Sequence, residues 1–364
     1  MREAAAGTGI YVGTALNSMY LSDATYSQTA AKEFSLMTPE NGCKMNFVAV
    51  DFTRSDYTRC KSLVDYAKKN SMAFRAHVLV WGAPDKHNPA FVRKETNATV
   101  LEEYMLRYIN ETMANIGSYP FAWDVVNEAV ENDNNEPQTI KTSPWSAIDG
   151  FICKAFKAAR KAQPNAQLFY NDYKHAAMAG KYKTKSDKVY EIVKTLKENN
   201  CGIDGVGFQN HIDISYTDEN IEAIRSNMQR YNDIGIKVHI TEMDVRCNHT
   251  VWFTDVCNVP KTWNTMMLQR QAEIYSKLLK VCLEEPNCLS FESWAYTDAH
   301  FYLPAKTGGR RSGNRAGAQN PYIMDAHYGK KPAYDAMLAT LNSWDKSSSV
   351  SQYKLNPFFN KSGS

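Results

Sequence analysis

The stretch Phe121-Ala-Trp-Asp-Val-Val-Asn127-Glu128 is a short apolar run that closes on two polar side chains. Short runs of this kind, with β-branched and aromatic residues, are typical of buried strands. A second run, Val238-His-Ile-Thr-Glu242-Met-Asp244, has the same character and also carries a glutamate towards its end. We therefore predict two strands that present carboxylates at one edge of a sheet, because the ends of parallel strands converge there.

Similar runs recur along the chain and alternate with longer segments of helical periodicity. We predict eight strands, at residues 11–15, 34–37, 73–80, 121–126, 167–170, 205–208, 237–240 and 288–293. Segments with apolar residues at helical spacing lie between them, at 55–70, 100–116, 148–162, 186–199, 219–234 and 267–283. This alternation favours an α/β fold, the (β/α)8 TIM barrel. A doubly wound sheet is the rival, but it usually carries a glycine-rich phosphate loop after its first strand, and Gly7-Thr-Gly9 is not one.

No linker rich in Pro, Ser or Gly divides the chain, so we predict a single barrel domain over residues 1–345. Residues 346–364 are expected to form a tail that is either wrapped on the barrel or disordered. Two inserted loops are expected, at 246–265 after the seventh strand and at 306–320 after the eighth. Both would overhang the end of the barrel where the strands finish.

Composition excludes several classes of protein. The chain has 364 residues, of which 43% are hydrophobic and 22% charged, and its net charge is +3. These values describe a globular chain with a large core, without the basic surface that nucleic acid or an anionic membrane requires. No apolar run is long enough to span a membrane. The 21 tyrosines and 7 tryptophans are compatible with sugar stacking, although most such rings fill cores.

Cysteine usage and glycosylation sequons predict an oxidising, extracellular location. Eight cysteines are present, and their spacing favours disulfides between neighbours: Cys43–Cys60, Cys153–Cys201, Cys247–Cys257 and Cys282–Cys288. A zinc site is the alternative, but paired Cys-x-x-Cys motifs are missing. The sequons at Asn97, Asn110, Asn248 and Asn360 agree with a secreted glycoprotein, although the segment Met1-Arg-Glu-Ala-Ala-Ala lacks the apolar stretch of a secretion signal.

Two carboxylates at strand ends are what glycosidic bond cleavage needs. One carboxyl group protonates the departing oxygen, and the other attacks or stabilises the oxocarbenium-like centre. A single glutamate at a strand end more often caps a helix or pairs with a lysine. Only the pair, Glu128 with Glu242, favours a hydrolase.

Seven motifs, in order, resemble those of the glycoside hydrolase family 10 endo-β-1,4-xylanases over about residues 11–341. They are Thr38-Pro-Glu40-Asn41 with Lys44, His77-Val-Leu-Val-Trp81, Trp123-Asp-Val-Val-Asn127-Glu128, Phe169-Tyr-Asn171-Asp172-Tyr173, Gly205-Val-Gly-Phe-Gln209-Asn-His211, Ile240-Thr-Glu242-Met-Asp244, and Trp294 with Asp298. Seven ordered matches are far more specific than any one of them.

The resemblance implies a retaining mechanism that needs no metal or cofactor. Glu242 would attack the anomeric carbon, while Glu128 would act first as the general acid and then as the general base. In the family, the histidine matching His211 hydrogen-bonds the nucleophile and the asparagine matching Asn127 binds the sugar 2-hydroxyl. Without the motifs, a histidine beside an apolar strand is more often a satisfied core residue.

The resemblance also implies sugar ligands, on plant cell-wall xylan or xylo-oligosaccharides as substrate. Those on the donor side are Glu40, Asn41, Lys44, His77, Trp81, Gln209 and Trp294, and Tyr173 resembles an acceptor-side platform. Read separately, Glu40 and Lys44 could form a surface ion pair, and the tryptophans could simply pack the barrel mouth. A monomer that binds neither nucleic acid nor membrane is expected.

The chain departs from the family pattern near the donor subsites. The family usually has a histidine directly after the residue matching Trp81 and a glutamine two further on, where this chain has Gly82 and Pro84. Two hydrogen-bonding groups are therefore missing, and we expect added space that changes the accepted sugar or branch. Tyr302 replaces a common tryptophan, and Gly42-Cys43 replaces Glu-Met.

Two readings remain beside the xylanase. A related β-glycanase would use the altered donor subsites for another backbone sugar. A non-catalytic carbohydrate-binding protein would retain the cleft without turnover. The cluster Arg310-Arg311 with Arg315 is read as a solvated loop, with recognition of glucuronic acid branches as the alternative.

Overall fold

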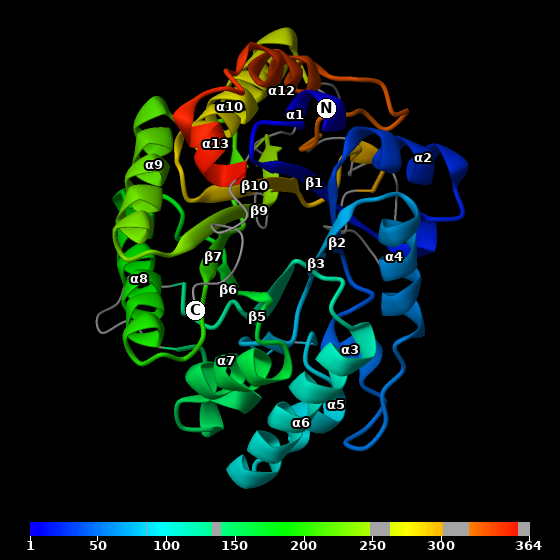
Figure 1. The fold of residues 1–364 in the computed structure, drawn as a ribbon, viewed down its shortest axis with the longest axis vertical. Helices are drawn as coiled ribbons and strands as arrows, with labels where there is room; N and C mark the ends of the chain where they lie inside the picture. The colour runs from blue at the N-terminus through cyan, green and yellow to red at the C-terminus, as the bar shows by residue number, and fades with distance from the viewer. Residues whose placement is uncertain (85, 133–139, 248–262, 301–319, 356–364) are drawn as a thin grey trace.

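The computed structural model describes residues 1–84, 86–132, 140–247, 263–300 and 320–355. In this part of the chain eight parallel strands close into a barrel (Figure 1), because β10 pairs with both β9 and β1. In order around the barrel they are β1 (Tyr11–Leu16), β2 (Leu36–Pro39), β3 (Ala73–Ala76), β5 (Ala122–Asn127), β6 (Gln167–Asp172), β7 (Gly205–Phe208), β9 (Lys237–Arg246) and β10 (Cys288–Ser293). Closure confirms the predicted (β/α)8 barrel and excludes the doubly wound sheet, in which the two edge strands do not pair with each other.

All eight predicted strands are present, with shifted ends. β2 begins at Leu36 and not at residue 34, and the predicted strand 73–80 is divided into β3 and the short β4 (Val80–Trp81), which pairs with β5. β9 continues to Arg246, past its predicted end at 240. The extension pairs with β8 (His211–Asp213), which was not predicted because three residues carry too little pattern.

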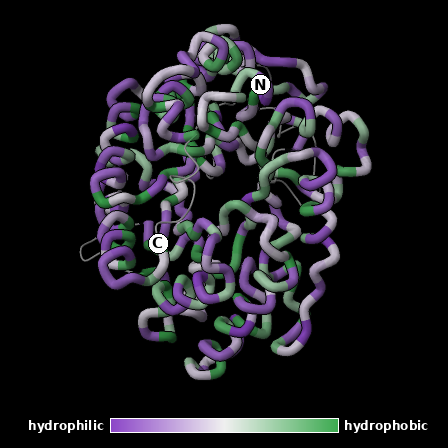
Figure 2. Tube along the Cα trace, viewed as in Figure 1, coloured by the Kyte–Doolittle hydropathy of each residue, from purple (hydrophilic) through white to green (hydrophobic). Residues whose placement is uncertain are grey.

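Helices surround the barrel, and the six predicted ones are present as α4 (Thr58–Lys69), α6 (Ala98–Ile116), α7 (Phe151–Ala162), α8 (Lys183–Glu198), α9 (Asp218–Asp233) and α10 (Thr265–Glu284). Hydrophilic and hydrophobic segments alternate along these helices (Figure 2), as expected for one buried face. α2 (Ala24–Glu33) and α12 (Pro332–Ser343) were not predicted; α2 buries only Tyr26, Ala30 and Glu33, which is too weak an apolar stripe. Shorter elements are α1 (Arg2–Ala5), α3 (Met45–Val48), α5 (Ala90–Lys94), α13 (Ser349–Leu355), η1 (Ser18–Tyr20), η2 (Pro144–Ala147), η3 (Gly180–Tyr182) and η4 (Asp298–His300).

An ionic network occupies the interior of the barrel. The fully buried guanidinium of Arg75 binds both carboxylate oxygens of Asp124, at 2.6 and 3.1 Å, and donates to Nδ1 of His239 at 2.6 Å. Burial and the neighbouring Arg75 lower the pKa of His239 far below its usual value, so a neutral ring accepts this bond. Glu292 lies 3.8 Å from Arg75 and accepts hydrogen bonds from two hydroxyls. Burial raises its pKa to about 7, although Arg75 opposes the shift.

Disulfides tie the outer elements together. The predicted pairs Cys43–Cys60, Cys153–Cys201 and Cys282–Cys288 are confirmed, so the zinc reading is wrong for these cysteines. Cys257, predicted to pair with Cys247, lies outside the described residues.

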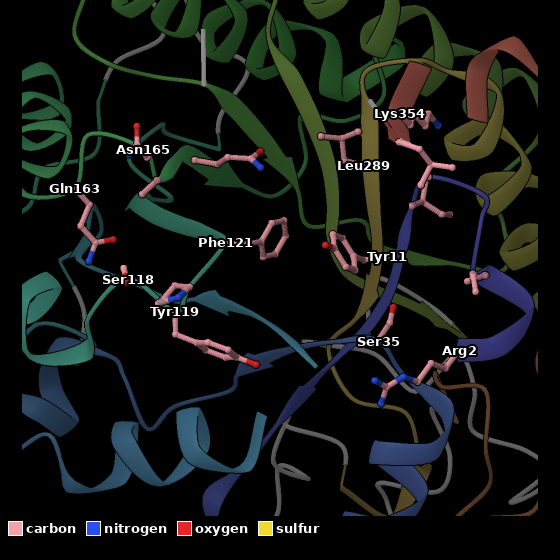
Figure 3. Close-up of a pocket in the computed structure, with 18 of the residues that line it drawn as sticks. Arg2, Tyr11, Ser35, Ser118, Tyr119, Phe121, Gln163, Asn165, Leu289 and Lys354 are labelled. Carbon is pink, nitrogen blue, oxygen red and sulfur yellow. The ribbon is translucent and has the colours of Figure 1, made fainter. Parts of the chain in front are cut away.

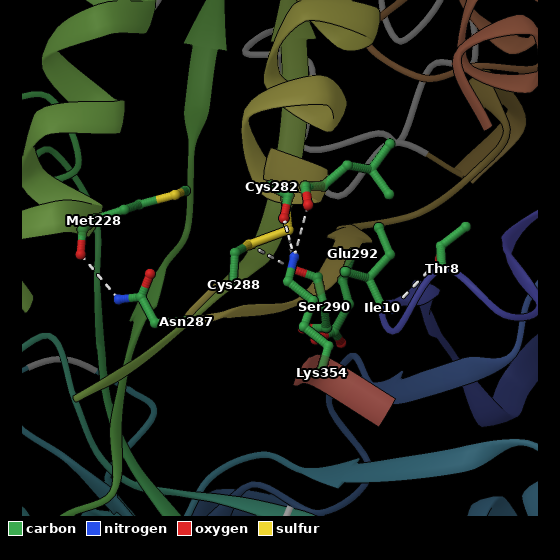
Figure 4. Close-up of a disulfide and its surroundings, with 10 residues drawn as sticks. Thr8, Ile10, Met228, Cys282, Asn287, Cys288, Ser290, Glu292 and Lys354 are labelled. Atoms are coloured by element: carbon green, nitrogen blue, oxygen red, sulfur yellow. Dashed lines mark hydrogen bonds between the residues drawn. A yellow bond between two sulfur atoms is a disulfide. The ribbon is translucent and has the colours of Figure 1, made fainter. Parts of the chain in front are cut away.

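The beginning of the predicted tail is wrapped on the barrel. Lys354, in α13, is buried and donates to the carbonyl oxygens of Cys282 and Leu283 at 2.6 and 3.0 Å (Figure 4). These carbonyls belong to the last turn of α10, where a helix lacks its own donors. The wrapped alternative therefore holds as far as Leu355, and the boundary at residue 345 stays a prediction.

A cavity of about 870 Å³ lies at the end of the barrel where the strands begin. Tyr11 and Phe121 lie against it with ring centroids 5.1 Å apart, and Leu289 and Lys354 also line it (Figure 3). Neither glutamate of the predicted pair lines this cavity. Among the described helices, none combines the length and the apolar character that crossing a membrane requires.

Candidate active site

The two glutamates lie at the carboxyl ends of barrel strands. Glu128 directly follows β5, and its backbone N–H donates to the carbonyl of Asn171 at 2.9 Å. Glu242 lies in β9, and its backbone N–H donates to the carbonyl of Gln209 at 3.1 Å. The parallel hydrogen-bonding pattern therefore fixes both glutamates at the same end of the barrel.

A chain of amides joins the two carboxylates. The side-chain amide of Asn171 donates to Oε1 of Glu242 at 2.8 Å and to Oδ1 of Asn127 at 2.9 Å. Gln209 donates to Oε1 of Glu128 at 3.0 Å and to the same Asn127 oxygen at 3.3 Å. Both donors therefore fix the orientation of Asn127, whose buried Nδ2 has no hydrogen-bond partner in the described structure. A buried donor without a partner at a site of this kind is available to a ligand.

A line of alternating charges supports Glu242. His211 Nε2 donates to Oε2 of Glu242 at 3.1 Å, and Nδ1 donates to Asp244 at 2.7 Å. Burial alone would lower the pKa of His211, but Asp244 and Glu242 outweigh it and raise the pKa to about 9. Arg246 binds both oxygens of Asp244, at 2.9 and 3.1 Å. His211 is therefore an imidazolium at neutral pH and stabilises the negative charge of Glu242.

Glu128 lies in a different environment. Burial raises the pKa of its carboxyl group, the ammonium of Lys141 opposes the shift, and the negative charges of Asp172 and Glu242 add to it. Its φ of 56° lies in the left-handed region, which is unusual for a residue with a side chain and is often found at functional sites. Glu128 is therefore close to other negative charges, whereas Glu242 accepts a hydrogen bond from His211.

The polar and aromatic residues that were expected on the donor side lie after β2, in β4 and after β10. Asn41 donates to Glu40 at 2.9 Å and accepts from Lys44 at 3.2 Å. The ammonium of Lys44 is 5.0 Å from the ring centroid of Trp81 and 5.5 Å from that of Trp294. Asn41 therefore lies between Glu40 and Lys44, and the ammonium of Lys44 is directed to the two tryptophan rings. The alternative that Glu40 and Lys44 form a simple surface ion pair is wrong.

His77 connects this group to the barrel interior. Its Nδ1 donates to Oδ2 of Asp124 at 2.9 Å, and its Nε2 is buried without a partner among the described residues. The His77 ring lies edge-on to Trp294, with centroids 5.2 Å apart. His87, which the sequence did not single out, stacks on Trp81 at 4.1 Å.

Gly82 is packed closely against Ala129. A Cβ atom on Gly82 would lie 2.5 Å from both Cα and Cβ of Ala129, the residue after Glu128. A side chain at residue 82 would therefore collide with Ala129, because the two backbones approach closely there, and the expectation of added space in the subsite stays a prediction. Pro84 is exposed, and Tyr302 and the cluster at 310–315 lie outside the described residues.

Tyr173 lies on the Glu128 side, with lysines around its ring. Lys185 and Lys141 lie 4.1 and 4.9 Å from the ring centroid, and Asn132 donates to the hydroxyl at 2.5 Å. Lys185 also pairs with Asp172 at 2.7 Å.

Sequence reasoning missed several of these residues. Asn171 and Asp172 were part of a recognised motif but had no role assigned, whereas Lys141 and Lys185 lie in segments without a motif. The residues next to a lysine in the sequence do not show that it belongs to a site, when the side chains that it contacts come from other strands. Only the chain's folding brings Lys141 to Tyr173.

A closed (β/α)8 barrel with two carboxylates, amides and tryptophans at its carboxyl end defines a glycoside hydrolase. The family model described as "Glycosyl hydrolase family 10" matches residues 1–340. The chain belongs to glycosyl hydrolase family 10.

Individual relatives agree. Endo-1,4-beta-xylanase B of Thermotoga neapolitana is 30% identical over 351 residues, covering 93% of this chain and 90% of that protein. Endo-1,4-beta-xylanase D of Talaromyces funiculosus is 30% identical over 337 residues, covering 92% and 75%. The crystal structure of xylanase 10B from Thermotoga petrophila in complex with xylobiose is 30% identical, with a TM-score of 0.81 over 93% of this chain and 96% of that one.

Proposed function

We propose that this chain is a retaining endo-β-1,4-xylanase that hydrolyses internal bonds of plant xylan. The observation that carries the proposal is the unequal pair of carboxylates. Glu242 accepts hydrogen bonds from Asn171 and the His211 imidazolium, whereas burial raises the pKa of Glu128. The relatives named xylanases support xylan as the substrate.

In the first step Glu242 attacks the anomeric carbon and forms an ester bond, while the glycosidic bond breaks. Glu128 gives its proton to the departing oxygen and becomes a carboxylate. The imidazolium of His211 holds the carboxylate of Glu242 in place and does not transfer its own proton.

In the second step Glu128 removes a proton from water, and the resulting hydroxide attacks the same carbon. The ester bond to Glu242 breaks, and the sugar leaves with its original configuration after two inversions. Asn127 contributes in both steps, because its unpartnered Nδ2 can donate to the sugar 2-hydroxyl as charge develops on the ring.

The remaining predicted residues bind the sugar chain. Glu40, Asn41 and Lys44 supply donors and acceptors for hydroxyls, and Trp81 and Trp294 supply apolar faces. The xylan backbone carries no charge. An uncharged substrate fits this subsite, because the ammonium of Lys44 is directed to the rings of Trp81 and Trp294.

A related β-glycanase is the second candidate. The close contact between Gly82 and Ala129, together with the stacking of His87 on Trp81, replaces the family's usual polar side chains. Fewer hydrogen-bonding groups at the donor subsites would weaken discrimination between backbone sugars.

Product analysis tests both candidates. The protein and a Glu242→Ala variant would be incubated with glucuronoarabinoxylan and with carboxymethylcellulose, and the products identified by mass spectrometry. Short xylo-oligosaccharides from the protein alone support the proposal, and products from the glucan alone support the related glycanase. Binding to xylan without products from either polymer would favour a carbohydrate-binding protein.

Glu128→Ala separates the two carboxylates. With an aryl xylobioside, whose leaving group needs no proton, this variant should accumulate the glycosyl-enzyme, and azide should restore turnover and give a β-glycosyl azide. An α-azide would contradict the assignment of Glu242 as nucleophile.

We further propose that the protein is secreted, glycosylated and monomeric. The three disulfides between described cysteines support an oxidising compartment, and the sequon residues Asn97 and Asn110 are exposed. Loss of mass on treatment with a glycosidase specific for Asn-linked glycans, in protein from a eukaryotic secretion host, tests the glycosylation.

A further inference from the structure

Lys141 is a buried cation that the proposed mechanism has not yet used. The residue is 6% exposed, and its backbone N–H donates at 2.7 Å to the carbonyl of Ala129, the residue directly after Glu128. An isolated bridge between Val130 and Ile140 holds the same two segments together. The backbone of Lys141 is therefore tied to the chain that carries Glu128.

The ammonium of Lys141 has no carboxylate within ion-pair distance among the described residues. It donates to the hydroxyl of Tyr173 at 3.4 Å and lies 4.9 Å from the centroid of that ring. Asp172, whose charge acts most strongly on the pKa of Lys141, is already occupied. Its oxygens accept from Lys185 at 2.7 Å, from the Tyr170 hydroxyl at 2.7 Å and from the Tyr173 backbone at 2.8 Å.

The negative charges around Lys141, with Asp172 the largest and Glu128 among them, offset its burial, so the ammonium keeps its proton. A cation held in this way can stabilise further negative charge that forms near it during the reaction. Glu128 is the group in which this happens, since the first step converts its acid into a carboxylate. The hydrogen bond from Lys141 to the Tyr173 hydroxyl does not by itself require a charged side chain, because a neutral donor could also make it.

We infer that the ammonium of Lys141 stabilises the carboxylate that forms on Glu128 when it protonates the departing sugar, which makes Lys141 a positioning residue of the acid/base. The lysine keeps its own proton throughout. In the first step the proton passes from Glu128 to the glycosidic oxygen, and in the second step Glu128 recovers a proton from water. This inference rests on the proposed retaining mechanism.

The charges around the two groups are consistent with this role. Glu128 faces Lys141, Asp172 and Glu242; burial raises its pKa most, and Lys141 is the largest opposing influence. Lys141 faces Asp172, Tyr173 and Glu128, which together outweigh burial and raise its pKa above the ordinary value for lysine. Lys185 also lies at this ring but is paired with Asp172. Lys141 therefore remains charged over the whole range in which Glu128 titrates.

The test is the pH profile of kcat/KM for Lys141→Met, with Lys141→Arg and Lys174→Met as controls. Lys174 is exposed and lies 5.8 Å from the centroid of the same Tyr173 ring, so its removal takes away a lysine from this ring without taking away a buried charge. We expect Lys141→Met to shift the alkaline limb upward by about one pH unit, the lower end of the effect of a nearby charge. Lys141→Arg and Lys174→Met should leave the limb within a few tenths of a unit.

The leaving group provides a second readout. Xylo-oligosaccharides need proton donation, so their kcat/KM at the optimum should fall about tenfold in Lys141→Met, by analogy with other losses of charge stabilisation. For an aryl xylobioside with a nitrophenolate leaving group, kcat/KM of Lys141→Met should fall less than threefold, because this leaving group needs no proton. A merely structural lysine would reduce both substrates equally and leave the alkaline limb in place, and that result overturns the inference.

Failure of the inference can be told apart from failure of the proposed function. If the parent protein cleaves xylan and Glu242→Ala does not, but Lys141→Met keeps the parent profile, only the role of Lys141 is wrong. If Lys141→Met does not fold, Lys141→Gln provides the same loss of charge with a polar side chain, and circular dichroism confirms the fold before kinetics.

Discussion

Gly82→Ala tests whether close packing, rather than open space, defines the donor side of this site. In the structure a Cβ atom at residue 82 would lie 2.5 Å from Cα and 2.9 Å from N of Ala129, and ordinary contacts begin at 3.4 Å. The backbones must therefore separate by about 0.9 Å, and neither contact is the movable end of a side chain. Gly82 also donates to the carbonyl of Asn127 at 2.7 Å, so the separation strains a hydrogen bond beside both Asn127 and Glu128.

We expect two measurable effects. Overpacking of this kind costs about 1–3 kcal/mol of stability. Misplacement of a catalytic group by about 1 Å reduces kcat/KM about 10- to 100-fold. The loss should fall mainly on kcat, because the residue that moves is the acid/base and the distant sugar ligands keep their positions. Steady-state kinetics on xylo-oligosaccharides and urea denaturation measure the two effects.

Two further variants control this experiment. Gly180→Ala adds a methyl group where no atom lies within 4 Å, at a φ of 55°, so it should lose about 1 kcal/mol of stability and no activity. Gly82→Ala combined with Ala129→Gly removes one of the clashes and should restore part of kcat. If Gly82→Ala has parental kinetics and stability, the packing argument is refuted and space at residue 82 must be reconsidered.

Two other predictions concern stability. The chain-entropy model gives about 4 kcal/mol for Cys153–Cys201, with a separation of 48, and about 2 kcal/mol for Cys282–Cys288, with a separation of 6. Alanine replacement of the first pair should therefore lower the urea midpoint more, and the reverse order would contradict the entropic account. Glu292 has a pKa raised from 4.5 to about 7 by burial, so its stabilising protonated form is lost as the pH rises through 7. Glu292→Gln should gain up to about 3 kcal/mol relative to the parent between pH 4.5 and pH 8, seen in thermal unfolding, and parallel curves would refute this.

Much of the fold could be predicted because its signals are local. β5 (Ala122–Asn127) is recognisable as a short apolar run, and α6 (Ala98–Ile116) as a long periodic one, without reference to any other part of the chain. Sequential disulfides follow from spacing for the same reason. β8 and α2 escaped prediction because their stability comes from neighbouring elements and not from their own pattern.

The amino-acid sequence by itself determined the barrel, the pair Glu128 and Glu242, and the motif residues that surround them, since each is written in a short segment. Only the tertiary structure decided how these groups are charged and spaced. The imidazolium of His211 depends on Asp244, which β9 brings to 2.7 Å, and the pKa of Glu128 depends on the charge of Asp172, at the end of β6. The contact of Gly82 with Ala129 likewise joins two strand ends that are distant in the chain. Electrostatic interaction and close packing depend on distances through space, which residues far apart in sequence acquire only when the barrel closes.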